Sequence, residues 1–171
     1  MDYAFSLARE ADAPAVFALY RGMIGTPGCT WSDDYPDTEI VLRDIRTDSL
    51  YVLKDSRGQL IAAAAAGPDD ELKDLPWDLE NPCELARVAV AITHQNKGVG
   101  TYLLRQVIAA VKARGFGGIR MLVSIHHPHA LALYDKNGFQ RLDTVHMYGH
   151  DFYRYQMAFQ SYPKRPSGIS L

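Results

Sequence analysis

The sequence predicts a single mixed α/β domain, and two observations support this fold class. Apolar runs typical of strands alternate with helical segments in the order strand, two helices, three strands, helix, strand, helix, two strands. The 171 residues are enough for one domain with a real core, and neither a repeat nor an interdomain linker is visible. We therefore expect one domain over residues 1–160. The tail over 161–171, with two prolines and no periodic pattern, is expected to be loosely ordered.

The N-terminal half combines strands with two helices. Asp12 and Pro14 are typical of a helix start, and Gly25 of a helix end. The alanines at 62–66 favour helix by propensity, but their segment is short and bracketed by glycines, which indicates a strand. The expected elements are a strand at 5–7, helices from Asp12 to Gly25 and at 37–48, and a hairpin of strands 50–54 and 59–66.

The C-terminal half contains the clearest helix, at 98–114. Its apolar residues Val99, Leu103, Val107 and Val111 recur at every fourth position, and Gly115 follows its end. The other expected elements are a strand at 84–92, a strand at 119–125 buried on both faces, a helix at 129–136, and two aromatic-rich strands within 139–159 that turn near Gly149.

Composition and charge exclude several classes of protein. The net charge of −2 argues against a nucleic-acid partner, because binding to phosphates usually needs a more basic surface. The two cysteines, Cys29 and Cys83, form neither a disulfide framework nor a Cys-x-x-Cys pair. The N-terminus carries no secretory pattern, and no apolar run is long enough to cross a membrane. We therefore expect a cytoplasmic protein with no membrane partner.

The most informative segment joins the strand at 84–92 to the helix at 98–114. It reads Gln95-Asn96-Lys97-Gly98-Val99-Gly100-Thr101. Free backbone N–H groups and the dipole at a helix start attract anions, and glycines let a phosphate approach closely. The Gly-Lys-Ser/Thr ending of a Walker loop and the three-glycine dinucleotide pattern are both absent. From these residues alone, a phosphate cradle and a simple tight turn are equally good explanations.

Two motifs together resemble the GCN5-related N-acetyltransferase (GNAT) family. The segment from Gln95 to Gly100 matches that family's Gln/Arg-x-x-Gly-x-Gly/Ala signature, and the Leu133-Tyr134 to Gly138-Phe139 segment matches its second motif, Leu-Tyr-x-x-x-Gly-Phe. The similarity covers roughly residues 84–140. It implies a GNAT-like α/β fold, with a mostly antiparallel central sheet, helices on both faces and a splayed cofactor cleft.

The resemblance implies which residues bind acetyl-coenzyme A (acetyl-CoA). The pantetheine arm would lie along the strand at Val88, Ala89 and Val90 by hydrogen bonding to its backbone. The diphosphate would lie on the amides of the loop and helix start. The remaining contacts would come from the second motif. The implied cofactor-binding residues are Val88, Ala89, Val90, Gln95, Asn96, Lys97, Gly98, Val99, Gly100, Thr101, His127, Ala130 and Tyr134.

Two residues match catalytic positions of the family. Tyr134 matches the tyrosine near the thioester sulfur, where a phenol can protonate the departing thiolate; the alternative is a tyrosine that only packs. Glu84 matches a position often held by a carboxylate that accepts the amine's proton, usually through water. The alternatives are a solvent-facing glutamate and water as the base.

Other features leave their roles open. His127 stands where the family has an asparagine that contacts the cofactor and caps a helix, and histidine is a weaker cap. His126, His127 and His129 crowd together, but without a nearby cysteine or carboxylate in the sequence we predict no metal site. The acidic loop 68–82 is either a plain turn or a site for a cationic amine. The aromatic residues within 148–155 line an acceptor pocket, meet at a dimer interface or are simply buried.

The resemblance predicts an acetyl-CoA-dependent N-acetyltransferase, with acetyl-CoA as co-substrate. A primary amine, of a small molecule by preference, would attack directly in a ternary complex, without a covalent enzyme intermediate. By analogy with the family, a homodimer would be unsurprising. One alternative is a domain that binds and senses acetyl-CoA without turnover, and another is an α/β interaction protein without a cofactor. The acceptor is not encoded in any pattern that we recognise.

Overall fold

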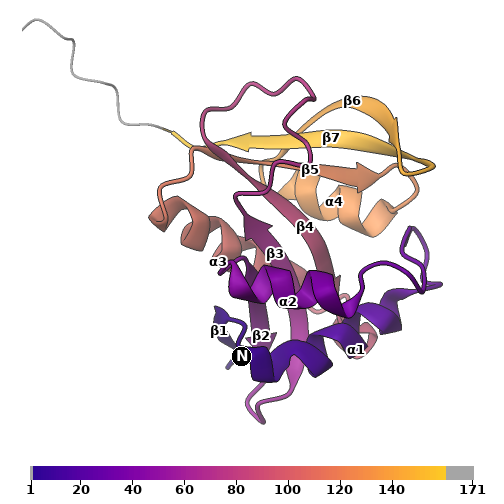
Figure 1. Ribbon diagram of the computed structural model, residues 1–171, viewed down its shortest axis with the longest axis vertical. Helices are drawn as coiled ribbons and strands as arrows, with labels where there is room; N and C mark the ends of the chain where they lie inside the picture. Colours follow the sequence, from indigo (N-terminus) through magenta and orange to yellow (C-terminus); the bar gives the residue numbers. More distant parts are fainter. Residues whose placement is uncertain (1, 161–171) are drawn as a thin grey trace, which may run out of the picture.

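A sheet of seven strands organises residues 2–160, the part of the chain that the computed structural model describes (Figure 1). The strand order is β1-β2-β3-β4-β5-β7-β6. The strands are β1 (Ala4–Leu7), β2 (Leu50–Lys54), β3 (Leu60–Gly67), β4 (Pro82–Val90), β5 (Gly118–Ser124), β6 (Gln140–Met147) and β7 (His150–Ala158). The helices are α1 (Ala13–Met23), α2 (Thr38–Arg46), α3 (Val99–Ala113) and α4 (Pro128–Lys136), with 3-10 turns η1 (Glu10–Asp12) and η2 (Ile92–His94). The tail predicted over 161–171 lies outside the described residues.

The strands β4 and β5 meet at only one end. They pair in parallel over three positions, of which the last joins Glu84 to Arg120, whereas the other neighbouring strands pair antiparallel. Beyond Glu84 and Arg120 the two strands separate, as the diverging β4 and β5 ribbons in Figure 1 illustrate. The predicted fold is therefore confirmed: the sheet is mostly antiparallel, and it is splayed in the middle.

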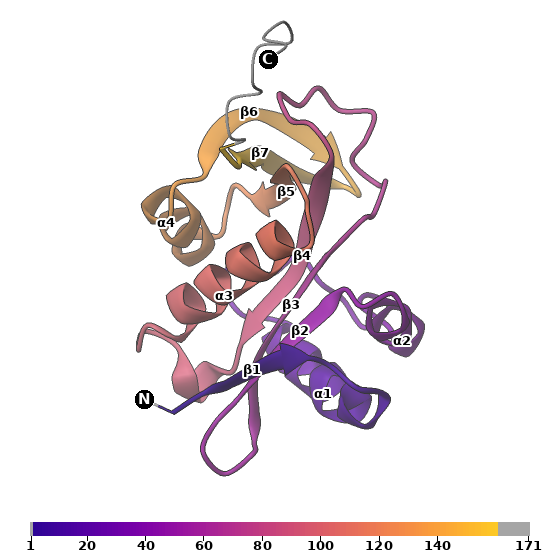
Figure 2. The same ribbon diagram turned by 90° about the vertical axis from the view of Figure 1, so that its left-hand side faces the viewer.

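Helices cover both faces of the sheet, with α1 and α2 on one side and α3 and α4 on the other (Figure 2). Each side has its own apolar core. The four-residue repeat of α3 is buried against the sheet, from Val99 to Val111. The alanines of β3 alternate between the two cores, so that both layers of helices pack closely on this strand. Small side chains are therefore what a strand covered on both faces needs here.

Caps explain where the helices differ from the predicted ones. The helix predicted at 37–48 begins one residue later, because Asp37 lies outside it and accepts a hydrogen bond from the Ile40 amide at 2.9 Å, and it ends at Arg46. Asp12 precedes α1 as predicted, but its carboxylate accepts from the Arg9 amide and pairs with Lys54, each at 2.8 Å, instead of capping α1. Among residues 2–160, no helix has the length and apolarity that crossing a membrane requires.

Candidate active site

A cleft of about 1730 Å³ lies where β4 and β5 separate. This exceeds the roughly 300–1,000 Å³ typical of a site for one small ligand, so there is space for two substrates. Most of the residues predicted from the sequence line it: Glu84, Val88, Ala89, Val90, Gln95, Asn96, Gly98, Gly100, Thr101, His127, Ala130 and Tyr134. Segments far apart in the sequence thus meet around one cavity.

The start of α3 faces the cleft with an exposed backbone. Gly98 has φ +80°, and a Cβ built on it would meet nothing within 4 Å. Asn96 is also left-handed, at φ +60°. The first amides of a helix have no intrahelical acceptors, and the helix dipole adds positive potential there. The open space beside Gly98 and these amides fit a diphosphate.

Two residues of the predicted phosphate loop present no side chain to the cleft. Lys97 is exposed but does not line the cleft, and the Val99 side chain is buried in the core beneath α3. Val99 can serve an anion only through its backbone amide. The side chain of Gln95 donates from Nε2 to the Val90 carbonyl oxygen at 3.1 Å. This bond links the end of β4 to the loop.

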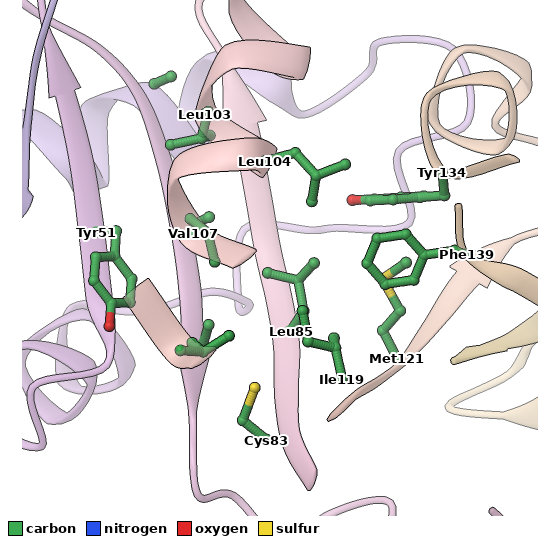
Figure 3. Packing of buried hydrophobic residues seen from close by; sticks show 14 of the residues in the cluster. Tyr51, Cys83, Leu85, Leu103, Leu104, Val107, Ile119, Met121, Tyr134 and Phe139 are labelled. Carbon is green, nitrogen blue, oxygen red and sulfur yellow. The ribbon is translucent and has the colours of Figure 1, made fainter. Parts of the chain in front are cut away.

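Tyr134 connects the apolar core to the cleft. It lies on α4 with 5% of its surface exposed, and its ring packs edge-on against Phe139 with centroids 5.5 Å apart. Figure 3 shows the side chain extending from α4 with its hydroxyl toward α3. Burial raises the pKa of this phenol, so the hydroxyl keeps its proton at neutral pH. A protonated phenol is what an acid for a departing thiolate must be.

Glu84 is held at the point where β4 and β5 part. Nε of Arg120 donates to its Oε2 at 2.9 Å, and the Leu72 amide donates to the same oxygen at 3.1 Å and to Oε1 at 3.2 Å. Burial raises the pKa of Glu84, and these partners act against that rise. The side chain is therefore buried, not solvent-facing, and Oε1 is the oxygen with more freedom to accept a proton. Its role as the base stays a prediction.

His127 takes the place of the family's capping asparagine. Its Nδ1 accepts a hydrogen bond from the Ala130 amide at 3.2 Å, which caps α4. Burial lowers the pKa of His127, and His129 acts in the same direction, so the ring stays neutral with Nδ1 free to accept. Within residues 2–160, no group of three or more His, Cys, Asp or Glu side chains is placed to hold a metal ion.

The other side of the cleft consists of three segments, each within a region where the resemblance to the family places acceptor specificity. They are the loop after α1, the acidic loop before β4, and the turn between β6 and β7. The hydroxyl of Tyr148 in that turn donates to Glu71 of the acidic loop, and Phe152 also lines the cleft. Tyr155, by contrast, is fully buried in the core.

The acidic loop is anchored to the sheet, so it is not a plain solvated turn. The Glu84 carboxylate binds the Leu72 amide, and Nη2 of Arg120 donates to the Asp69 carbonyl at 3.2 Å. The Asp78 amide donates to Oε1 of Gln156 on β7 at 3.1 Å. These contacts fix the shape of this side of the cleft.

One buried charge pair near the site was missed. Asp44 of α2 and Arg87 of β4 form an ion pair, and both residues are part of the wall of the cleft. A signal was present in the sequence, since Asp44 shares the buried helix face of Val41 and Ile45. A carboxylate on such a face needs a buried cation.

The loop after α1 reaches the start of α4 through Gly28. Its φ is +83°, and an added Cβ would lie 2.5 Å from the Cα of His127. We expect Gly28→Ala to lower the free energy of unfolding by about 3 kcal/mol, from overpacking against backbone and from left-handed strain. Gly25→Ala is the matched control, since Gly25 has φ +84° and open space, and it should cost only about 1 kcal/mol. Urea unfolding of both variants measures the difference, and equal losses would show that the contact is not tight.

The fold and the cleft together define a class: mixed α/β domains with a cleft between two splayed central strands and an open helix start beside it. Residues 15–139 match the model of the acetyltransferase (GNAT) family, so the chain belongs to this family. N-acetyltransferase family 8 member 3 of Mus musculus is 30% identical over 115 residues, 67% of this chain and 46% of that protein. The chain thus matches less than half the length of this curated relative.

Solved structures share the fold at low sequence identity. The ribosomal-protein-S18-alanine N-acetyltransferase from Escherichia coli has a TM-score of 0.75 and 18% identity, over 99% of this chain and 100% of that one. The structure of yncA from Salmonella typhimurium with its cofactor acetyl-CoA has a TM-score of 0.76 and 18% identity, over 98% and 99% of the two chains. The predicted fold and family are both confirmed.

Proposed function

We propose that the protein transfers the acetyl group of acetyl-CoA to a primary amine by direct attack in a ternary complex. The observation that carries this proposal is that the open helix start at Gly98 and the protonated phenol of Tyr134 line one cleft. Acetyl-CoA brings an activated thioester carbonyl and a diphosphate. The first is suited to acyl transfer and the second to the amides at the start of α3.

Different residues along the cleft would bind the two ends of acetyl-CoA and transfer the protons. The amides from Gln95 to Gly100 would hold the diphosphate, and the backbone from Val88 to Val90 would hold the pantetheine arm as an added strand. The amine nitrogen forms a bond to the acetyl carbon while the carbon–sulfur bond breaks. Glu84 or water takes a proton from the amine, and Tyr134 gives its proton to the thiolate. A buried, largely apolar wall around Tyr134 would keep water from the thioester.

The side of the cleft away from the helix start provides a separate place for the amine, which favours a complex with both substrates bound. Its walls are the anchored acidic loop and the turn with Tyr148, both apart from the helix start at Gly98. We propose a small-molecule amine as the acceptor, together with a cytoplasmic location. A homodimer stays a prediction.

A panel of amines tests the proposal. The purified protein is mixed with acetyl-CoA and each of a set of monoamines, diamines, amino acids and short peptides, and free thiol and acetylated product are measured together. We expect equal amounts of thiol and N-acetyl product with at least one amine. Binding of acetyl-CoA without product from any amine would instead favour a sensing domain, and no binding would exclude both functions.

A further inference from the structure

The strand β4 contains a β-bulge in the wall of the cleft. Ala65 of β3 lies opposite Ala86, but Ala63 lies opposite Ala89, so that Arg87 and Val88 share one partner position. Arg87 has a left-handed backbone, with φ +52°. This conformation is unfavourable for a residue with a Cβ, and it persists only where the surroundings hold it.

The extra residue changes which side of the sheet each side chain faces. Before the bulge, Cys83 and Leu85 lie in the core beneath α3; after it, Val88 and Val90 pack against that same core. Ala89 packs in the core beneath α1. Strict alternation from Leu85 would have placed Ala89, and not Val88, on the α3 side. The bulge therefore decides how the backbone from Val88 to Val90 is presented to the cleft.

The Arg87 side chain is clamped at that point from another layer of the fold. Its Nε donates to Oδ2 of Asp44 at 2.8 Å, and its Nη2 donates to Oδ1 at 3.1 Å. Its Nη1 donates to the hydroxyl of Tyr35 at 2.9 Å. Both charged side chains are only 5% exposed. A two-pronged pair of this kind fixes the direction as well as the position of the guanidinium.

We propose that Arg87 and Asp44 are positioning residues, which hold the bulge and thereby set the backbone of Val88 to Val90 for the thioester end of the ligand. The inference rests on the proposed function. The α3 start, which would bind the diphosphate, has no part in the clamp. Loss of the clamp should consequently weaken the hold on the pantetheine arm and slow the chemistry, while the hold on the diphosphate persists.

Two variants and a control separate positioning from plain stability. Asp44→Asn keeps the shape but removes the charge. The double variant Asp44→Leu/Arg87→Met replaces the pair by apolar groups, a change that folded proteins generally tolerate better than an orphaned charge. Arg46→Gln is the control, because Arg46 lies on the same helix as Asp44 and its ion pair to Glu10 is exposed.

Ligand-free amide hydrogen exchange is the first readout. Both clamp variants should exchange about tenfold faster over residues 86–90 than the wild type, while the α3 amides stay unchanged. Calorimetry then compares acetyl-CoA with 3′-phospho-ADP, which has the diphosphate but no pantetheine arm. We expect the Kd for acetyl-CoA to rise about tenfold, the Kd for 3′-phospho-ADP to stay within about twofold, and kcat to fall about a hundredfold.

The outcomes distinguish the inference from the proposed function. A wild type that binds no acetyl-CoA contradicts the function, whereas exchange over 86–90 still tests the clamp. A folded double variant with wild-type exchange, acetyl-CoA affinity and kcat would overturn the inference, because the pair would then be structural only. If Asp44→Asn does not fold, the double variant decides alone.

Discussion

Gly98→Glu should abolish the binding of acetyl-CoA at concentrations where the wild type is saturated. The new side chain would project into the open space beside the first amides of α3, where the diphosphate is expected. Near a protein surface, two like charges about 4 Å apart repel by about 4 kcal/mol. Since each 1.4 kcal/mol is a factor of ten, Kd should rise about a thousandfold. Calorimetric titration measures this directly.

The matched control is Gly115→Glu, at the other end of the same helix. Gly115 has φ +91° against +80° for Gly98, and neither has an atom within 4 Å of an added Cβ. Both variants should therefore lose about 1–2 kcal/mol of stability from left-handed strain. Only Gly98→Glu should lose the ligand. Equal affinities in the two variants would mean that the diphosphate does not lie at the start of α3.

Tyr134→Phe should lower kcat about a hundredfold and leave the Kd for acetyl-CoA within about threefold. The change removes the proton that the thiolate needs, and general acid catalysis contributes about a hundredfold or more. The ring and its packing against Phe139 remain, so the free energy of unfolding should hardly change. Steady-state kinetics give kcat, calorimetric titration gives the Kd for acetyl-CoA, and thermal unfolding gives the stability.

Tyr155→Phe, the control, should lower stability without lowering kcat. Its ring lies 6.0 Å from that of Tyr134, but its hydroxyl donates to Asp135 at 2.8 Å and accepts from Arg141 at 2.7 Å. Loss of these bonds should cost about 1–2 kcal/mol of stability and leave kcat unchanged. If Tyr134→Phe kept full kcat, a water molecule and not Tyr134 would protonate the thiolate.

The sequence predicted those helices and strands whose apolar pattern is clear within a single segment. The α3 helix followed from one apolar face, and β5 from a run buried on both sides. The ends were harder, because side chains such as Asp37 set them. The β3 alanines illustrate the limit of propensity, since two layers of helices required small side chains in a strand.

In the candidate site, too, the parts formed by short segments could be predicted, and the part formed by contacts between distant residues could not. The helix start at Gly98 and the Tyr134 motif are short segments, so their chemistry could be predicted from the sequence. The clamp of Asp44 and Arg87 joins residues 43 positions apart, through side chains that meet between α2 and β4. A left-handed arginine has no sequence signature, and the bulge it forms became visible only in the strand register.

The most direct test of the central claim is a crystal structure of the protein with acetyl-CoA. The account predicts the diphosphate on the amides of Gln95 to Gly100, the pantetheine arm beside Val88 to Val90, and the thioester sulfur within hydrogen-bonding reach of the Tyr134 hydroxyl. Acetyl-CoA bound elsewhere, or reversed so that its thioester lies at Gly98, would contradict it.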